Sequence, residues 1–290
     1  VKFNFMRPGM TDPASALVST EWLADHLDTP GLVILDGSHH LPTTGRDAKA
    51  EFVERHIAGA RFFDIDEIAD KNTDLPHMLP PADEFADKVG ALGIGNDDHV
   101  IVYDTIGTTG AARIWWTFRA MGHTRVSVLD GGMPKWLAEA RTVTADVATP
   151  TSKKRGARRQ AALVRSREDM LSNIESNAEQ VVDARSAGRF NASEPEPRAG
   201  MRGGHIPNSM NVPFPAVIHE DRTFKTPDEV RAIFAGAGVN LEAPITTTCG
   251  SGVTASTLAL ALFEAGVEDV AVYDGSWSEW GARQDTPIDQ

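Results

Sequence analysis

A weak internal repeat constrains this chain more than any other feature of its sequence. Four landmarks occur twice in the same order, about 145 residues apart: an apolar run that ends in Asp, a His-Ile pair, a second apolar run, and a Val-rich run followed by Asp-Gly. Trp136 and Trp280 follow this last Asp at the same spacing. A chain of 290 residues has room for two such domains. We therefore predict an N-terminal domain over residues 1–142, a linker over residues 143–162 and a C-terminal domain over residues 163–290.

Within each copy, short β-branched runs alternate with helical patterns. In the first copy the predicted strands cover residues 33–35, 100–103 and 126–129, and the predicted helices cover residues 21–27, 82–89 and 111–121. Strands that alternate with helices indicate a parallel sheet. Apolar runs with little polar alternation indicate that both faces of the sheet are covered. The predicted fold class is α/β, with each of the two tandem domains a parallel sheet covered by helices on both faces.

Composition excludes several classes of protein. The chain has 28 Lys and Arg residues and 41 Asp and Glu residues, so its formal net charge is −13. Because a nucleic-acid-binding protein needs a cationic surface for the phosphates, we expect no nucleic-acid partner. No apolar run approaches the roughly 18–20 residues that span a bilayer, and the N-terminal residues lack the apolar core of a secretory signal. Cys249 is the one cysteine, which excludes an intrachain disulfide. We therefore expect no membrane partner and a reducing, cytoplasmic location.

Cys249 begins the Gly-rich segment CGSGVTAS, between a predicted strand and a helical pattern. Ligands of open α/β sheets bind beyond the carboxyl ends of the strands. A helix N-terminus and free backbone amides there favour an anion, including a nucleophilic thiolate. A phosphatase loop of this kind needs Arg six residues after the cysteine, where this chain has Ala255. Sulfur transfer therefore remains, with a buried structural cysteine as the alternative.

The loop resembles the active-site loop of the 3-mercaptopyruvate sulfurtransferases, which have tandem rhodanese-like domains. The resemblance extends from about Val18 to Ala282 and includes the duplication. In this family only the C-terminal domain carries the cysteine. The matching N-terminal position here is Asp104, which implies a catalytically silent first domain. Thiosulfate-specific members typically carry Arg and Lys just after the cysteine. This chain has Gly250 and Ser251 there, which favours 3-mercaptopyruvate as the donor.

The resemblance also implies the roles of individual residues. Arg189 and Arg198 match the family's two substrate-arginine motifs and would hold the carboxylate and carbonyl oxygen of the donor. Ser251, His77 and Asp66 would form a proton relay beside the catalytic Cys249, with Asp66 orienting His77. This relay requires the N-terminal domain to face the cysteine loop, so the site would lie between the domains. The other loop residues expected to contact the substrate are Gly250, Gly252, Val253 and Thr254.

The predicted reaction moves sulfur from 3-mercaptopyruvate through a Cys249 persulfide to a thioredoxin-like thiol, a small thiol or cyanide, and releases pyruvate. It implies no metal and no organic cofactor. Two alternatives stay open, namely thiosulfate as the donor and a persulfide relay module that does not turn over a small donor. The His39-His40 pair lacks the spaced ligand partners of a metal site. The pattern predicts structural roles for His56 and His205, and an ion pair between Asp183 and Arg185.

Overall fold

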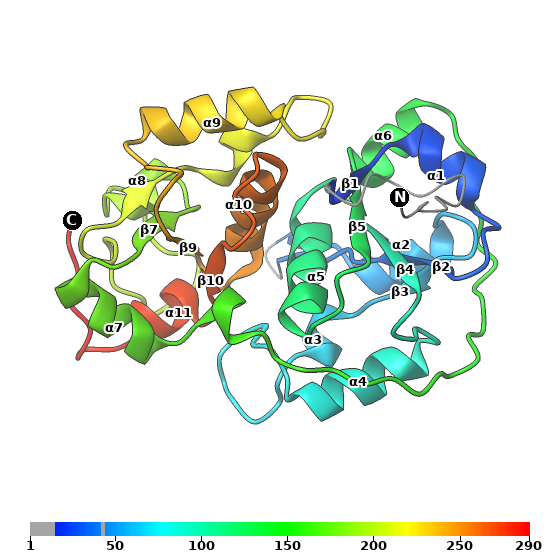
Figure 1. Cartoon of the computed structure of the whole chain (residues 1–290), viewed down its shortest axis with the longest axis horizontal. Coiled ribbons are helices and arrows are strands. Elements are labelled where there is room, and N and C mark those ends of the chain that lie inside the picture. Colours follow the sequence, from blue (N-terminus) through cyan, green and yellow to red (C-terminus); the bar gives the residue numbers. More distant parts are fainter. Residues whose placement is uncertain (1–14, 42–43) are drawn as a thin grey trace, which may run out of the picture.

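The structure of the chain is a computed structural model that describes residues 15–41 and 44–290. Residues 1–14 of the predicted N-terminal domain lie outside the described residues. Two five-stranded parallel sheets have the orders β1-β5-β4-β2-β3 and β6-β10-β9-β7-β8, which are the same order in each half. Helices flank each sheet (Figure 1). The predicted α/β class and the duplication are confirmed.

The N-terminal sheet has helices on both faces because its central strands are apolar on both sides. Val33 and Val100 belong to the core beneath one set of helices, and Ile34 and Ile101 belong to the core beneath the other. The elements of this domain are β1 (Leu17–Val18), α1 (Thr20–His26), β2 (Leu32–Asp36), α2 (Ala48–Glu54), β3 (Arg61–Phe62), α3 (Ile65–Ile68), α4 (Ala82–Ala91), β4 (His99–Tyr103), α5 (Thr109–Ala120), β5 (Val126–Leu129) and α6 (Gly132–Ala138).

The C-terminal domain repeats this arrangement, with a short additional helical segment before its first strand. Its elements are η2 (Ala161–Leu163), β6 (Val164–Arg165), α7 (Arg167–Ser176), β7 (Gln180–Asp183), α8 (Ala187–Phe190), β8 (Met210–Asn211), η3 (Phe214–Val217), α9 (Pro227–Gly236), β9 (Ile245–Thr248), α10 (Val253–Glu264), β10 (Ala271–Tyr273) and α11 (Ser276–Trp280). Among the described residues, no helix is both long enough and apolar enough to cross a bilayer.

The repeated histidines have matching structural contacts in the two domains. The His56 ring stacks on Phe52 with ring centroids 4.1 Å apart, and its Nδ1–H donates to the Phe52 carbonyl at 2.7 Å. The His205 ring stacks on Phe190 at 3.8 Å, and its Nδ1–H donates to the Phe190 carbonyl at 2.9 Å. Each ring fastens a loop to its own domain, which confirms the predicted structural role.

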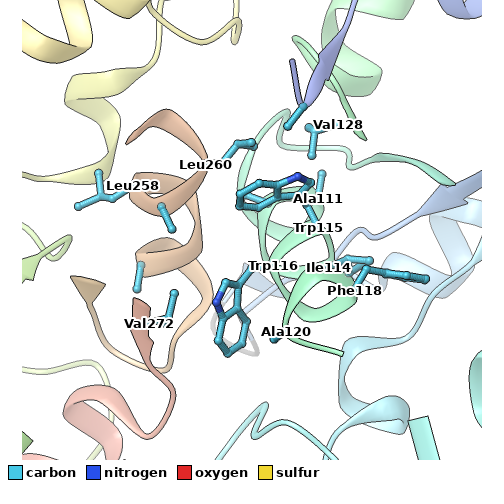
Figure 2. Packing of buried hydrophobic residues seen from close by; sticks show 14 of the residues in the cluster. Ala111, Ile114, Trp115, Trp116, Phe118, Ala120, Val128, Leu258, Leu260 and Val272 are labelled. Atoms are coloured by element: carbon cyan, nitrogen blue, oxygen red, sulfur yellow. The ribbon is translucent and has the colours of Figure 1, made fainter. Parts of the chain in front are cut away.

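The two domains pack through helices α5 and α10, which lie between the sheets (Figures 1 and 2). Every residue of α5 is buried except Arg119, because one face covers its own sheet and the other meets α10. Trp115 packs edge-on against Phe263 with centroids 5.5 Å apart, and the Arg119 guanidinium lies over both rings. A single cluster of buried apolar residues therefore continues from one domain into the other.

The segment between the domains is bound along the N-terminal domain. Within it, residues 145–160, all of them described, form no helix or strand. Lys153 Nζ lies 2.6 Å from the Asp98 carboxylate, and the Lys153 N–H donates to the Gly90 carbonyl at 2.9 Å. The Arg155 guanidinium lies 5.3 Å from the centre of the Phe85 ring. Lys153 and Arg155 therefore fasten the connection to the first domain.

Candidate active site

Cys249 lies directly after β9 and before α10, as predicted for a nucleophile at the carboxyl end of a strand. The residue is 2% exposed. Its N–H donates to Ser276 Oγ at 3.2 Å, and its carbonyl accepts the Trp277 N–H at 2.9 Å. Ser278 Oγ donates to the carbonyl of Gly250 at 2.6 Å. Helix α11 after β10 therefore holds the cysteine loop in place, a role of its serines that the sequence did not reveal.

The backbone amides of the cysteine loop are available to a ligand. Within the part of the chain that the structure describes, no N–H of residues 250–255 donates to a protein acceptor. Gly252 has a positive φ of 76° and caps α10, and a Cβ at this position would lie 2.6 Å from Arg113 Nη1. Glycine thus permits both the turn and the close approach. Free amides at a helix N-terminus form a site for an anion.

Asp104 fills the equivalent loop of the N-terminal domain with its own side chain. Its buried carboxylate accepts the N–H groups of Ile106 and Ala111, both at 2.8 Å, and that of Gly107. These are the amides that would otherwise face an anion. The first domain therefore has no nucleophilic sulfur at this position, and its loop amides are already satisfied.

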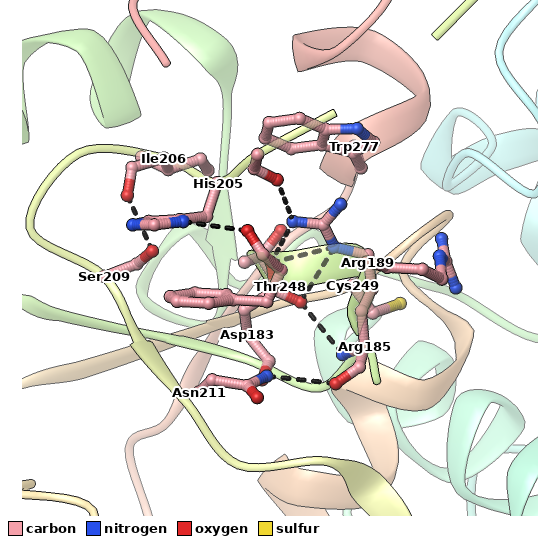
Figure 3. Close-up of polar contacts among 12 residues, drawn as sticks. Asp183, Arg185, Arg189, His205, Ile206, Ser209, Asn211, Thr248, Cys249 and Trp277 are labelled. Carbon is pink, nitrogen blue, oxygen red and sulfur yellow. Dashed lines mark hydrogen bonds and ion pairs between the residues drawn. The ribbon is translucent and has the colours of Figure 1, made fainter. Parts of the chain in front are cut away.

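A chain of alternating charges leads from β7 to the cysteine loop, and Figure 3 shows its first members, Asp183 and Arg185, with Arg189 beside Cys249. Arg185 Nη2 donates to Asp183 at 2.7 Å, which confirms the predicted pair, and Arg185 Nη1 donates to Glu196 at 2.7 Å. Glu196 in turn accepts from Arg189 Nη2 at 2.5 Å. Because Arg185, Asp183 and Glu196 are buried at the side chain, the array fixes the direction of the Arg189 guanidinium.

Both predicted substrate arginines reach the cysteine loop. A Cβ added to Gly250 would lie 3.1 Å from Arg189 Nη2 and 3.9 Å from Arg198 Nη1. The Arg189 side chain is 22% exposed. No carboxylate or carbonyl of the described residues accepts a hydrogen bond from Arg198. Two guanidinium groups beside free amides and a thiol can hold a small organic anion.

His77 and Asp66 form the predicted hydrogen bond. His77 Nδ1–H donates to Asp66 Oδ1 at 2.8 Å. The His39 and His77 rings hold the pKa of the Asp66 carboxyl well below its usual range. Burial lowers the pKa of His77 below its usual value, despite the opposing effect of Asp66. His77 is therefore neutral at neutral pH and can accept a proton, as a relay requires.

Arg113 and Asp274 connect the His77 loop to the cysteine loop across the domain boundary. Arg113 Nη2 donates to Asp274 Oδ1 at 2.7 Å and to the His77 carbonyl, and Nη1 donates to the Gly252 carbonyl at 3.4 Å. The Leu79 N–H donates to the other Asp274 oxygen at 2.8 Å. Neither residue stands out in the sequence. The one local signal is that Arg113 lies within α5, rather than at its end like Arg119, and is flanked by small and apolar residues.

The structure brings Ser251 into the same region without completing the relay. Its side chain is buried in the cysteine loop. Within residues 15–41 and 44–290, no hydrogen bond joins Ser251 to His77. The Asp66–His77 half of the predicted relay is therefore present in the geometry, and the Ser251 step stays a prediction.

His39 lies beside the Asp66–His77 pair. Its Nε2 is 3.6 Å from Asp66 Oδ2, and its ring meets the His77 ring edge-on with centroids 4.7 Å apart. The expectation that His39 lacks metal-ligand partners is therefore wrong. Its partners are distant in sequence and meet it only in the folded chain. His40 points elsewhere and pairs with Glu51 at 2.9 Å.

Comparison with known proteins agrees with this geometry. The family model of the Rhodanese-like domain matches the chain twice, over residues 19–139 and 166–283. The 3-mercaptopyruvate sulfurtransferase of Homo sapiens is 45% identical over 274 residues, which cover 92% of each chain. The thiosulfate sulfurtransferase of Cricetulus griseus is 47% identical over 272 residues, 91% of each. The crystal structure of the 3-mercaptopyruvate sulfurtransferase SseA from Escherichia coli superimposes with a TM-score of 0.83 and 38% identity, covering 91% of this chain and 99% of SseA.

Proposed function

The chain belongs to the rhodanese family of sulfurtransferases, and from that premise we propose that it takes sulfur from 3-mercaptopyruvate through a persulfide on Cys249. One observation carries this choice of donor. The positions after the cysteine are Gly250 and Ser251, and the guanidinium groups of Arg189 and Arg198 lie over that glycine. An α-keto acid offers a carboxylate and a carbonyl oxygen to two such groups, and the loop itself adds no further cation.

In the first step the Cys249 thiolate attacks the sulfur of 3-mercaptopyruvate. A sulfur–sulfur bond forms while the carbon–sulfur bond breaks, and the bonding electrons of the latter pass into an enolate of pyruvate. Arg189 and Arg198 stabilise that negative charge. Protonation of the enolate carbon gives pyruvate and leaves the persulfide, which the free amides of Gly250, Gly252, Val253 and Thr254 surround.

His77 is the proposed proton carrier for this step, with Ser251 between it and the reacting sulfur and Asp66 behind it. The hydrogen bond from His77 to Asp66 and the neutral state of the ring support this role. The link from Ser251 to His77 would have to form when the substrate binds. Hydrogen bonds of active sites often tighten only in the substrate complex.

In the second step an acceptor thiolate attacks the outer sulfur of the persulfide. The sulfur–sulfur bond to Cys249 breaks, the Cys249 thiolate is restored and the acceptor leaves as a persulfide. We propose a thioredoxin-like protein or a small thiol as the acceptor, with cyanide as a laboratory substitute that becomes thiocyanate. The scheme uses no metal or organic cofactor. We propose the cytoplasm as the location, because thiols are kept reduced there.

The test measures pyruvate release from 3-mercaptopyruvate with a thiol acceptor, beside thiocyanate formation from thiosulfate with cyanide. Wild type and Cys249→Ser are compared. We expect kcat/KM to favour 3-mercaptopyruvate by orders of magnitude, parallel lines in a two-substrate initial-rate plot, and no turnover by the variant. Intersecting lines without a persulfide on Cys249 in mass spectra would contradict the proposal.

Thiosulfate is the second candidate donor, because a relative named for thiosulfate is as similar to this chain as one named for 3-mercaptopyruvate. The same pair of assays separates the two donors. A persulfide relay without turnover of a small donor is the remaining alternative. The relay would be favoured if wild type turned over neither 3-mercaptopyruvate nor thiosulfate but acquired a persulfide on Cys249 from a protein donor.

A further inference from the structure

We propose that His39, Asp66 and His77 form a binding site for a divalent transition-metal ion, with Zn²⁺ as the natural occupant. One ligand atom from each residue lies within 4.8 Å of the other two. Two imidazole nitrogens and a carboxylate oxygen are ligands that Zn²⁺ prefers, and three protein ligands with an open fourth position are typical of an accessible zinc site. The site is separate from the cysteine loop in sequence and belongs to the N-terminal domain.

The geometry needs only a modest adjustment to accept the ion. Tetrahedral bonds of about 2.0–2.1 Å separate two ligand atoms by roughly 3.3 Å. His77 Nδ1 and Asp66 Oδ1 are 2.8 Å apart, and His39 Nε2 and Asp66 Oδ2 are 3.6 Å apart. The first separation is shorter than this value and the second is longer, and they involve different oxygens of the carboxylate. The side chains would therefore have to shift so that both imidazoles and one carboxylate oxygen meet the same ion.

Access and charge also suit a cation. The Asp66 side chain is 58% exposed and the His39 side chain 17%, whereas His77 is 6% exposed. An ion from solvent meets Asp66 first and then the two rings. His39 and His77 contact the same carboxylate through its two different oxygens. An ion pair with the Asp66 carboxylate needs only one basic partner. Two imidazole nitrogens that face this carboxylate form the kind of ligand set that holds a metal ion.

Metal binding would switch off the proton carrier, a consequence that rests on the proposed function. Zn²⁺ needs the lone pair of His77 Nδ1, which now carries the proton donated to Asp66. The ring proton moves to Nε2, so the imidazole stays neutral, and Asp66 becomes a metal ligand. His77 can then no longer accept a proton during turnover. The protein would be inhibited reversibly by Zn²⁺ even though its reaction needs no metal.

The binding test first removes the one cysteine of the chain, because a thiolate would also bind zinc. An untagged Cys249→Ser protein is titrated with Zn²⁺ by calorimetry, and with Co²⁺ by its visible absorption, which reports tetrahedral coordination. We expect one site. His39→Phe in the same background should weaken binding at least about tenfold, because Phe preserves the edge-on ring contact with His77 but has no ligand atom. His219→Gln is the matched control, since His219 also lies near a carboxylate but outside the cluster.

Each outcome of this titration decides the proposal. Loss of binding in His39→Phe with unchanged binding in His219→Gln supports it. Absence of binding, or equal affinity in the His39→Phe variant, overturns it. Melting temperatures show that the variants fold, and His39→Gln serves as a second variant if the Phe ring is not accommodated.

A separate activity arm distinguishes this proposal from the proposed function. Wild type and His39→Phe are assayed at buffered free Zn²⁺, each relative to its own activity with chelator. We expect a several-fold larger inhibition of wild type, reversed by chelation. Binding that leaves activity unchanged would keep the metal site and refute the proton-carrying role of His77. Equal inhibition of both proteins would assign the effect to Cys249 or to the donor thiol.

Discussion

Replacing Arg113 with Met removes the buried charge that joins the two domains at the active site. Arg113 Nη2 and Asp274 Oδ1 are 2.7 Å apart, and both side chains are 2% exposed. At an effective dielectric constant of about 20, two unit charges at this separation attract by about 6 kcal/mol. Most of that attraction offsets desolvation, but a variant that removes one partner leaves the other buried and uncompensated. We therefore expect Arg113→Met to lower the free energy of unfolding by about 3–5 kcal/mol.

The assay is urea unfolding followed by fluorescence of the buried tryptophans, with Arg119→Met as the matched control. Both arginines lie on α5, and both stack on a tryptophan: Arg113 is 4.5 Å from the Trp116 ring centre, and Arg119 is 4.9 Å from that of Trp115. Among the described residues, Arg119 makes no ion pair. Because Arg119 lies over both Trp115 and Phe263, its substitution should cost about 1–2 kcal/mol, less than the loss expected for Arg113→Met.

The double variant Arg113→Met/Asp274→Asn completes the experiment. A neutral Asn can still accept the Leu79 N–H, so we expect this variant to recover about 1–3 kcal/mol relative to Arg113→Met alone. Equal losses for Arg113→Met and Arg119→Met, or a double variant no more stable than the single one, would refute the charge argument. Turnover should fall with Arg113→Met, because the same guanidinium contacts the His77 and Gly252 carbonyls.

Three further predictions follow from the site and the domain boundary. Arg198→Lys should raise KM for 3-mercaptopyruvate about tenfold, since Lys cannot make the bidentate contact, and an unchanged KM would remove Arg198 from the site. Glu196→Gln should raise the same KM severalfold by releasing Arg189, which steady-state kinetics at matched melting temperature would check. Burial raises the pKa of Asp130 to about 6 from 3.8, so the folded state binds this proton more tightly and stability rises as pH falls through about 6. Asp130→Asn should therefore be more stable than wild type at pH above 7, by at most about 3 kcal/mol, and this advantage should disappear near pH 4; a difference that does not vary with pH in unfolding experiments would contradict it.

The sequence predicts the parts of this protein that depend on local pattern. The apolar runs locate the central strands, because a strand buried on both faces leaves a continuous apolar signal. The repeat reveals the duplication, and the glycines after Cys249 predict a turn between strand and helix. Each of these signals is contained in a few consecutive residues.

Contacts between distant segments could not be predicted in this way. Arg113 and Asp274 meet because α5 docks against α10, and no pattern in either segment specifies that docking. His39 next to His40 gives no sign of which ring faces Asp66, since the direction of a loop side chain depends on the backbone turn after β2. Glu196 likewise appears as one acidic residue among prolines until the fold places it between two arginines.

The self-filled loop of the first domain has a consequence for the whole molecule. The Asp104 carboxyl occupies its own loop permanently and accepts the amides at the start of α5. Among the described residues, the corresponding amides at the start of α10 have no protein acceptor. The two halves are therefore alike in architecture but unequal in how their loop amides are satisfied. In the proposed cycle the outer sulfur of the Cys249 persulfide would lie among the second set of amides, so this loop would be filled and emptied with every turnover while the first stays filled.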